Sequence, residues 1–311
     1  MKTAVVTGAF GFAGANLVEC LLKNGYKVYC VGRKKPTLTH NDRFEEGVCL
    51  KKIYLEMEEF YRIPEFVPEK PDFFFHLAWG GKRDDFDAQR KNVDGALKAM
   101  DAAAVLSCKR FVGIGSQAEY GIKSEEELIT EDLRLEPFTA YGACKAAAFY
   151  MLKEKAALMG IEFVWGRIFS LIGKYEPEGR MLPDLVKKLQ RKENVQLSSC
   201  LQYWDYLDVT DAAAAILGLA EKGRNGEDYN IANGEFRELK EYVLEAAQIL
   251  RADPKLINFG NRAEPFVSLR PSVEKLCRDT GWKPEKTFEY SVSSYNKVTV
   301  QTEMRTVLRI S

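Results

Sequence analysis

Two residues one helical turn apart have side chains that could transfer a proton. Tyr141 is the only one of the fourteen tyrosines that has a lysine, Lys145, four residues later. On a helix, this spacing places both side chains on one face. Tyrosine has an ordinary pKa of about 10, and we expect the lysine cation, with any cofactor cation bound nearby, to lower the pKa of Tyr141. Tyr141 would then act as a general acid/base.

A serine at the end of an apolar run completes the candidate catalytic group. Ser116 follows the predicted strand Arg110–Gly115, and Tyr141 begins a predicted helix. Open α/β sheets build their sites at such strand ends. We expect Ser116 to hold the reacting oxygen and Lys145 to bind the nicotinamide ribose as well. Cys144 has no histidine nearby in the sequence, so we interpret it as a small packing residue.

A glycine-rich segment near the start of the chain could bind a dinucleotide. Gly8, Gly11 and Gly14 follow the predicted strand Thr3–Thr7 and open a predicted helix. Glycines there allow a tight turn, a close approach of the backbone to a pyrophosphate, and close packing of helix on strand. The helix N-terminus supplies N–H donors and the positive end of the helix dipole. The expected ligand is therefore a dinucleotide.

The residues after the second predicted strand bear on the choice between NAD and NADP. A carboxylate about 20 residues after the glycines would bind the ribose 2′-hydroxyl of NAD. Here that carboxylate is missing, and Arg33 stands beside the position, followed by Lys34 and Lys35. A guanidinium would pair with a 2′-phosphate. We therefore favour NADP, with NAD as the alternative; a solvated basic turn would also explain the two lysines.

Alternating strand and helix patterns predict the fold that positions these residues. The predicted strands are Thr3–Thr7, Lys27–Val31, Leu50–Leu55, Asp72–Ala78, Arg110–Gly115 and Glu162–Phe169. Helix patterns at Ala15–Asn24 and Asp87–Leu106 lie between them. We expect an α/β fold: a doubly wound, Rossmann-like parallel sheet with a smaller C-terminal substrate-binding lobe. Residues 1–170 and about 195–232 would form the dinucleotide-binding domain, and about 171–194 and 233–311 the lobe.

Composition limits the partners. The 45 lysines and arginines balance the 45 aspartates and glutamates, so no global field favours a nucleic acid or an acidic membrane. No apolar stretch approaches the roughly 20 residues of a membrane span. Seven scattered cysteines indicate reduced thiols in a cytoplasmic protein, and two histidines offer little material for a metal site. Alanine runs at 102–104 and 146–148 favour a homodimer with a shared helical interface.

These motifs together resemble the extended branch of the short-chain dehydrogenase/reductase superfamily, the NAD-dependent epimerase/dehydratase family, whose members mostly modify nucleotide-linked sugars. The glycines have that branch's G-x-x-G-x-x-G spacing, and Ser116, Tyr141 and Lys145 match its catalytic triad. The resemblance runs from residue 3 to about residue 290. Its further segments are His76–Trp79, Lys91–Gly95, Arg167–Gly173, Arg180–Pro183, Trp204–Val209 and Gly281–Pro284.

The resemblance implies roles for further residues. The expected cofactor contacts are Gly8, Phe10, Gly11, Phe12, Gly14, Arg33, Leu77, Ala78, Asn92, Tyr141, Lys145 and Ile168. The expected substrate contacts are Ser116, Gln117, Ser170, Arg180, Met181 and Arg262. Asn92 should also tie its helix to the neighbouring strand and support the lysine. We expect His76 to be a packed strand residue.

Two residues depart from the family's pattern at the substrate end. Ser170 takes the place of the usual asparagine, and Trp204 takes the place of the usual arginine in Arg-Asp-Phe-x-x-Val. That arginine often helps bind the substrate diphosphate. The departure implies either that Arg180 or Arg262 compensates or that the substrate lacks a conventional nucleoside diphosphate.

The segment that begins at Ser116 narrows the reaction. The family's 4,6-dehydratases read Thr-Asp-Glu there, whereas this chain reads Ser116, Gln117 and Ala118. These residues offer no acid and base for an elimination, and we expect Glu119 to face elsewhere. We favour an NADPH-dependent keto-sugar reductase with Tyr141 as general acid/base. The alternative is a nucleotide-sugar epimerase with retained NAD; a 4,6-dehydratase and a non-catalytic cofactor-binding sensor are disfavoured.

Overall fold

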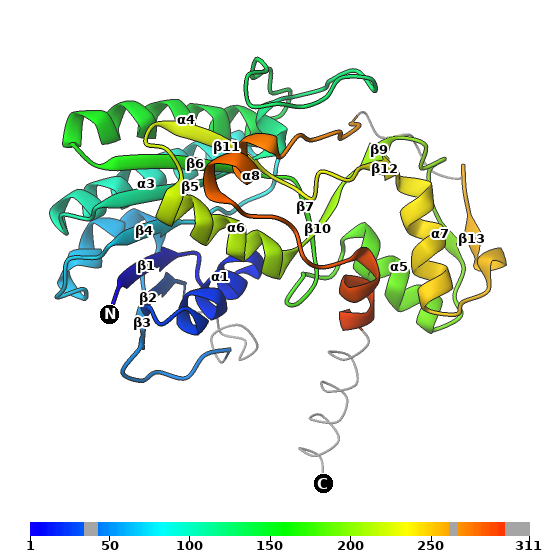
Figure 1. Ribbon diagram of the computed structural model, residues 1–311, viewed down its shortest axis with the longest axis horizontal. Helices are drawn as coiled ribbons and strands as arrows, with labels where there is room; N and C mark the ends of the chain where they lie inside the picture. Colours follow the sequence, from blue (N-terminus) through cyan, green and yellow to red (C-terminus); the bar gives the residue numbers. More distant parts are fainter. Residues whose placement is uncertain (34–42, 261–266, 296–311) are drawn as a thin grey trace, which may run out of the picture.

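A computed structural model of the chain describes residues 1–33, 43–260 and 267–295. Its centre is a seven-stranded sheet in the order β11-β6-β5-β4-β1-β2-β3, in which all neighbouring strands are parallel (Figure 1). The strand order reverses between β1 and β4, so the predicted doubly wound α/β fold is confirmed. The strands are β1 (Thr3–Thr7), β2 (Lys27–Gly32), β3 (Leu50–Tyr54), β4 (Phe73–His76), β5 (Arg110–Ser116), β6 (Glu162–Ile168) and β11 (Glu227–Ile231).

Six of the seven strands lie close to their predicted positions because their sequences carry the signature of a covered sheet, whereas β11 was not predicted. Every residue of β4 is buried, and β5 is buried beyond its first residue. Such strands have apolar residues on both faces and read as continuous runs. Helix α1 (Phe12–Lys23) begins earlier than the predicted Ala15, because the glycine loop leads directly into its first turn with Gly11 as N-cap.

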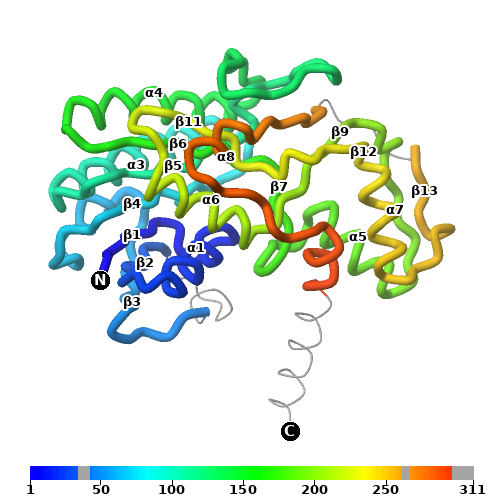
Figure 2. Tube along the Cα trace, in the orientation of Figure 1, coloured from blue at the N-terminus to red at the C-terminus, as the bar shows by residue number. Residues whose placement is uncertain are grey.

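Helices cover both faces of the sheet, as Figure 2 shows. On one face, α3 (Phe86–Val105), α4 (Ala140–Met159) and the 3-10 segment η1 (Met57–Glu65) share a core with β4, β5 and β6. On the other face, α1, α6 (Val209–Lys222) and α8 (Glu274–Thr280) share a second core. The sheet therefore presents its strand ends, rather than its faces, to solvent.

Part of each alanine run packs inside the chain. Ala102 and Ala103 of α3 lie in the same buried core as Ala148 of α4. Their small side chains let the two helices of one chain approach closely. Ala147 of α4 is exposed, so the homodimer with a shared helical interface stays a prediction. Cys144 is buried in this core, so its interpretation as a packing residue is confirmed.

A smaller lobe lies beside the sheet, on the right in Figure 1. Its core is formed by apolar side chains of its two helices and of the short strands between them. The helices are α5 (Met181–Gln190) and α7 (Leu239–Ile249). The paired strands are β7 (Ser170–Ile172) with β10 (Tyr206–Asp208), β9 (Tyr203–Trp204) with β12 (Arg237–Glu238), and β8 (Val195–Gln196) with β13 (Ile257–Asn258).

Two segments pack differently from the expected division of the chain. Val195 and Cys200, which we assigned to the dinucleotide-binding domain, are buried in the core of the smaller lobe. Leu276 and Trp282, which we assigned to the lobe, are buried in the core of the large sheet. The Trp282 indole donates a hydrogen bond to the Asp211 carbonyl oxygen on α6 at 3.1 Å. The chain therefore crosses between the two parts more often than composition indicated.

The described residues show no membrane-spanning helix and no metal cluster. No helix among them combines the length and the apolar character that crossing a membrane requires. Within the same ranges, no three histidine, cysteine, aspartate or glutamate side chains gather as ligands for a metal ion would. The cysteines of the described residues form no disulfide bond.

Candidate active site

A cleft of about 830 Å³ opens at the carboxyl ends of the strands. One wall comes from the residues that follow β1, β4, β5 and β6, and the other from the 168–182 segment and the short strands of the smaller lobe. Strands β1 and β4 are the neighbours at which the strand order reverses. Ligands of open α/β sheets bind at that point.

Most of the predicted site residues lie together in this cleft. Those that line it are Gly8, Gly11, Phe12, Gly14, Leu77, Ser116, Gln117, Tyr141, Lys145, Ile168, Ser170, Arg180 and Met181. Four predicted residues, Phe10, Arg33, Ala78 and Asn92, are not part of its lining. Arg262 lies outside the described residues. The structure thus brings the glycine loop, the triad and most of the substrate contacts to one place.

The glycine loop has the shape that a pyrophosphate site needs. Gly8 has φ +72°, and a Cβ there would lie 2.7 Å from the Ala78 amide nitrogen. A Cβ on Gly14 would lie 2.1 Å from the Gly8 carbonyl oxygen, so neither position accepts a side chain without a backbone shift. No side chain caps α1 at Gly11. The first N–H groups of α1 therefore face the cleft, together with the positive end of the helix dipole.

The triad is assembled from the end of a strand and the start of a helix. Ser116 ends β5, and Tyr141 and Lys145 lie in the first turns of α4, whose N-cap Thr139 accepts a hydrogen bond from the Gly142 amide. The side chains of Tyr141 and Ser116 both line the cleft. This pair places a proton donor beside a hydroxyl that can orient a substrate oxygen.

The pKa of Tyr141 is raised in the protein alone, and the predicted lowering, which also counted a cofactor cation, stays a prediction. Burial disfavours the phenolate and raises the pKa, while the hydrogen bond with Ser116 and the cations Arg83 and Arg180 oppose that rise. The Arg83 guanidinium lies 4.8 Å from the centre of the Tyr141 ring. Tyr141 therefore holds its proton at neutral pH, which is the form that can donate to a substrate oxygen.

Lys145 is buried beside the tyrosine and is held by two contacts. Its Nζ donates a hydrogen bond to the Ile114 carbonyl oxygen at 2.6 Å and lies 3.8 Å from the centre of the Trp79 ring. Burial lowers the pKa of Lys145 to about 7, and the negative charge of Glu119 opposes this lowering. A cation over an aromatic face is stabilised, so Trp79 also favours the charged form.

Trp79 is a residue of the site that the sequence reasoning did not assign. Its indole Nε1 donates to Gln89 Oε1 at 2.7 Å, which fixes the ring against Lys145. The same ring meets Tyr141 edge to face, with 6.3 Å between ring centres. The only signal in the sequence was that Trp79 ends the segment His76–Trp79, which resembles the family. That segment did not indicate contacts with Lys145 or Tyr141.

His76 is a packed strand residue, as predicted. The ring is buried between Phe60 and Phe111, and its Nδ1 lies 2.8 Å from the Thr7 hydroxyl. Burial, with the nearby Lys145 cation, lowers the pKa of His76 to about 3. The ring is therefore neutral at physiological pH and shapes the floor beneath the site.

Asn92 supports the site from outside the cleft. Its Nδ2 donates to the carbonyl oxygens of Gly80 at 2.9 Å and Ala88 at 3.0 Å, and its Oδ1 accepts from the Gly80 amide at 2.9 Å. It thereby ties α3 to the segment after β4, close to the predicted role. The side-chain amide of Asn92 makes these bonds to Gly80 and Ala88. Its predicted contacts with the cofactor and with the lysine stay predictions.

Phe10 and Ala78 also support the loop from behind it. The Phe10 ring stacks on Tyr54, with 5.8 Å between ring centres. The Ala78 backbone packs so closely against Gly8 that a Cβ on Gly8 would lie 2.7 Å from the Ala78 amide nitrogen. Both residues therefore support the glycine loop, and their contact with a cofactor stays a prediction.

Arg33 directly follows β2 and is exposed. The preceding residue, Gly32, packs against the Phe10 ring, because a Cβ on Gly32 would lie 2.8 Å from that ring. The backbone of Arg33 therefore follows directly after a contact with the glycine loop. Lys34 and Lys35 lie outside the described residues. Arg33 does not line the cleft, yet its place at the strand end is the one predicted for contact with a 2′-phosphate.

A second arginine, Arg43, contacts the same loop and was not predicted. Its Nη1 donates to the carbonyl oxygens of Phe10 at 2.9 Å and Gly11 at 3.4 Å. Its guanidinium lies 4.2 Å from the centre of the Tyr175 ring. Arg43 therefore joins the glycine loop to the segment that enters the smaller lobe, a contact between residues too distant in sequence to be read from a motif.

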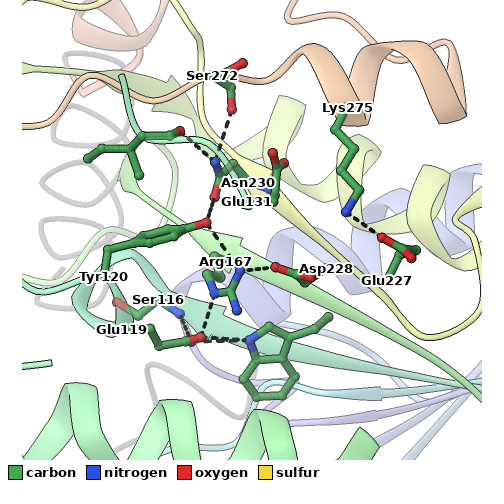
Figure 3. Close-up of polar contacts among 12 residues, drawn as sticks. Ser116, Glu119, Tyr120, Glu131, Arg167, Glu227, Asp228, Asn230, Ser272 and Lys275 are labelled. Atoms are coloured by element: carbon green, nitrogen blue, oxygen red, sulfur yellow. Dashed lines mark hydrogen bonds and ion pairs between the residues drawn. The ribbon is translucent and has the colours of Figure 1, made fainter. Parts of the chain in front are cut away.

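Among the described residues, the two that follow Ser116 bring no carboxylic acid to Tyr141. Gln117 lines the cleft, and Ala118 is buried. Glu119 faces away from the cleft, as predicted, and its carboxylate accepts a hydrogen bond from Arg167 at 2.7 Å (Figure 3). Among the described residues that line the cleft, Glu176 is the one carboxylic acid.

The substrate end of the cleft has an aromatic wall. Trp204 and Tyr206 lie there, so the usual arginine position is occupied by an indole. Arg180 is the nearby cation: its guanidinium lies 5.5 Å from the centre of the Phe12 ring, and half of its side chain is exposed. Arg180 is thus placed to reach an anionic group of a bound substrate.

Glu176 is the second residue of the site that sequence reasoning missed. Its carboxylate accepts hydrogen bonds from the Tyr295 hydroxyl and from the Gly173 amide, and lies 3.9 Å from Arg180. Burial raises the pKa of Glu176 to about 7, against the effects of Tyr295 and Arg180. No spacing in the sequence could have found it, because its burial depends on Tyr295 near the far end of the described chain.

Residues 4–232 match the sequence profile described as the NAD dependent epimerase/dehydratase family. The chain belongs to this family. Its membership in the extended short-chain dehydrogenase/reductase branch, predicted from the resemblance, is confirmed, and the chain is an enzyme. The match covers the glycine loop, the triad and all seven strands of the large sheet.

Relatives of this NAD-dependent epimerase/dehydratase family member cover most of its length. It is 27% identical over 243 residues to the GDP-6-deoxy-D-mannose reductase of Pseudomonas aeruginosa, which covers 72% of this chain and 79% of the relative. Two solved structures share its fold. The dTDP-glucose 4,6-dehydratase of Bacillus anthracis in complex with NAD has a TM-score of 0.86 and 21% identity, covering 96% of this chain and 97% of the other. RMD from Pseudomonas aeruginosa complexed with NADPH has a TM-score of 0.80 and 23% identity, covering 95% and 97%.

Proposed function

We propose that the chain is an NADPH-dependent reductase of a nucleotide-linked keto sugar. The observation that carries the proposal is the placement of Tyr141, Ser116 and Lys145 together in a cleft that begins at the glycine loop, where Gln117 and Ala118 take the place of an acid and base pair. This arrangement suits delivery of one proton to an oxygen. It does not suit elimination of water, which needs a separate acid and base.

Each residue of the triad would have its own role in a carbonyl reduction. When bound, NADPH supplies the hydride that adds to the carbonyl carbon. Ser116 orients the carbonyl oxygen, and Tyr141 transfers its phenolic proton to that oxygen, so that the C=O bond becomes an alcohol. Lys145, as a cation, stabilises the phenolate that remains and binds the ribose hydroxyls.

Two further features support a reductase that uses NADPH. Arg33 follows β2 where a carboxylate would select NAD, and a guanidinium there pairs with a 2′-phosphate. The relative from Pseudomonas aeruginosa is named a reductase, and the related structure RMD binds NADPH. For the substrate, Arg180 is the side chain that would contact a phosphate, with Trp204 and Tyr206 packing against the nucleotide or sugar.

The test is to follow the absorbance of NADPH while the protein is supplied with nucleotide-linked 4-keto sugars. Consumption of NADPH with conversion of the keto group to a hydroxyl group on the nucleotide-linked sugar supports the reductase. Interconversion of two nucleotide sugars without net consumption of cofactor would instead establish the epimerase, which uses the same three catalytic residues.

A homodimer and a cytoplasmic location belong to the same proposal. Helix α4 exposes Tyr150, Met151 and Leu158, and α3 exposes Val105 near its end, so these helices offer apolar side chains to a second copy. The cysteines of the described residues form no disulfide bond, which suits a reducing compartment. A sedimentation mass equal to one chain at micromolar concentration would overturn the dimer.

A further inference from the structure

A buried ion pair lies directly behind the catalytic serine. The side chains of Glu119 and Arg167 are 0% and 1% exposed, and Arg167 Nε donates to Glu119 Oε2 at 2.7 Å. Taking two charges out of water is costly, so a buried pair is weak evidence for stability by itself. The position of the pair behind Ser116 raises the question of what its charges do for the site (Figure 3).

The Glu119 carboxylate is surrounded by hydrogen-bond donors. Its Oε1 accepts from the Ser116 backbone amide at 2.8 Å, and both oxygens lie 3.2 Å from Trp165 Nε1. Arg167 completes the set. A carboxylate without a proton accepts all of these bonds, whereas a protonated acid would place a hydrogen against a donor. Burial raises the pKa of Glu119, and Arg167 together with the Ser116 amide opposes that rise in favour of the ionised form.

Two glycines in β5 make room for this arrangement. A Cβ on Gly115 would lie 2.2 Å from Glu119 Oε1, and a Cβ on Gly113 would lie 2.4 Å from the Trp165 ring. The carboxylate and the indole therefore pack directly onto the backbone of the strand that ends in Ser116. Any side chain at position 115 would displace the charge from the back of the site.

The far side of Arg167 is anchored to the last strand of the sheet. Its Nη1 is paired with Asp228 of β11 and lies 3.3 Å from the Tyr120 hydroxyl. Tyr120 in turn donates to Asn230 Oδ1 at 2.7 Å. Figure 3 shows this chain of contacts running from Ser116 through Arg167 to β11. Glu119 is thus held between the catalytic strand and a fixed cation.

The charge of Glu119 also reaches the catalytic helix. It favours the cationic form of Lys145, whose Nζ is bonded to the Ile114 carbonyl oxygen on the same strand. The other titratable groups that face these residues are Tyr141 on α4 and His76 on β4, and His76 is neutral at physiological pH. Glu119 is therefore the negative charge that opposes the cost of burying the Lys145 cation.

We propose that Glu119 is a positioning residue of the reaction: locked by Arg167, its carboxylate holds the Ser116 backbone in place and keeps Lys145 in its cationic form. This inference rests on the proposed function for its catalytic consequence. Its electrostatic part concerns Lys145 alone and can be measured without any substrate or cofactor.

The test is an NMR titration of the free protein labelled with ¹³C at the lysine Cε, with the Lys145 signal assigned by its loss in Lys145→Arg. We expect the Lys145 midpoint in Glu119→Gln to fall by about one pH unit below that of the wild type. The matched control is Asp228→Asn, which removes the other carboxylate partner of Arg167 but leaves Glu119 in place. It should cost stability while leaving the Lys145 midpoint unchanged.

An unchanged Lys145 midpoint in Glu119→Gln, or an equal shift in Asp228→Asn, would overturn the electrostatic part. Glu119→Asp provides a second variant if Glu119→Gln does not fold. It keeps the charge but shortens the side chain, so we expect a midpoint near that of the wild type and a kcat lowered about tenfold or more. A wild-type kcat in Glu119→Asp would overturn the role in holding Ser116. Absence of NADPH oxidation by the wild type would reject the proposed function. The Lys145 titration midpoints would still test the electrostatic part of the inference.

Discussion

The two ends of the cleft are built from different materials. At the cofactor end, the surface is mostly backbone: Gly8 and Gly14 exclude side chains by contact distances below 3 Å, and α1 offers uncapped N–H groups. At the substrate end, the surface is made of side chains from separate segments, among them Glu176 and Trp204. A backbone surface cannot change without moving the fold, whereas a side-chain surface can change one residue at a time. Substitutions at the substrate end could therefore change specificity while the cofactor end stays the same.

The largest expected effect comes from removing the proton donor between the two ends. Tyr141→Phe should lower kcat about 1,000-fold, within the range of general acid catalysis, because the alkoxide would lose its proton source. NADPH affinity and the melting temperature should change little. The matched control is Tyr150→Phe, an exposed tyrosine on the same helix, which should retain wild-type turnover. Unchanged turnover in Tyr141→Phe would remove the catalytic assignment.

The next effect tests the claim that backbone shapes the cofactor end. Gly14→Ala should weaken NADPH binding about 100-fold, or about 2.7 kcal/mol, because the new Cβ would lie 2.1 Å from the Gly8 carbonyl oxygen. A fluorescence titration measures the affinity. Gly47→Ala is the control, since a Cβ at Gly47 meets nothing within 4 Å. Equal affinities in the two variants would show that the loop tolerates a side chain.

A smaller effect concerns the selection of the cofactor. Arg33→Ala should reduce the preference for NADPH over NADH about tenfold, or about 1.4 kcal/mol, through loss of the guanidinium at the end of β2. Arg43→Ala should weaken both cofactors alike, because Arg43 contacts carbonyl groups of the glycine loop. Parallel titrations of each variant with the two cofactors separate the roles. A constant ratio in Arg33→Ala would contradict the use of this residue to assign NADP.

The smallest effect is expected at the substrate end, as a dependence on pH. Glu176, with its pKa raised to about 7, is neutral below that pH and negative above it. Because it lies 3.9 Å from Arg180, its charge should repel an anionic substrate, and KM should rise about fivefold between pH 6 and pH 8, or about 1 kcal/mol. Glu176→Gln should flatten this rise without changing kcat. A KM that rises equally in both proteins would exclude Glu176 as the cause.

The same residue gives a stability prediction whose sign follows from proton binding. The usual pKa of 4.5 applies to the unfolded chain, and the folded value is higher, so the folded state binds more protons between these two values. Stability should therefore fall as pH rises from about 4.5 to 7, and Glu176→Gln should remove that part of the slope in thermal melts.

The sequence allowed the fold and the cofactor end to be predicted because their signals are local. Each strand of the large sheet is one short run, and the G-x-x-G-x-x-G loop and the Tyr141 and Lys145 pair are contiguous motifs. The residues that were missed depend on distant contacts: Glu176 is buried by Tyr295, and Arg43 reaches back to Phe10. The effect of burial on the pKa of Tyr141 was not predicted either, because burial depends on packing that the sequence does not report.

The proposed NADPH-dependent reduction is tested most simply by identifying any nucleotide that is released when freshly purified protein is denatured. The protein is then titrated with NADPH and with NADH. A reductase that consumes its cofactor predicts an empty protein that binds NADPH at least about tenfold more tightly than NADH. Release of one NAD per chain would contradict the account, because it would show the retained cofactor of an epimerase and remove the argument from Arg33.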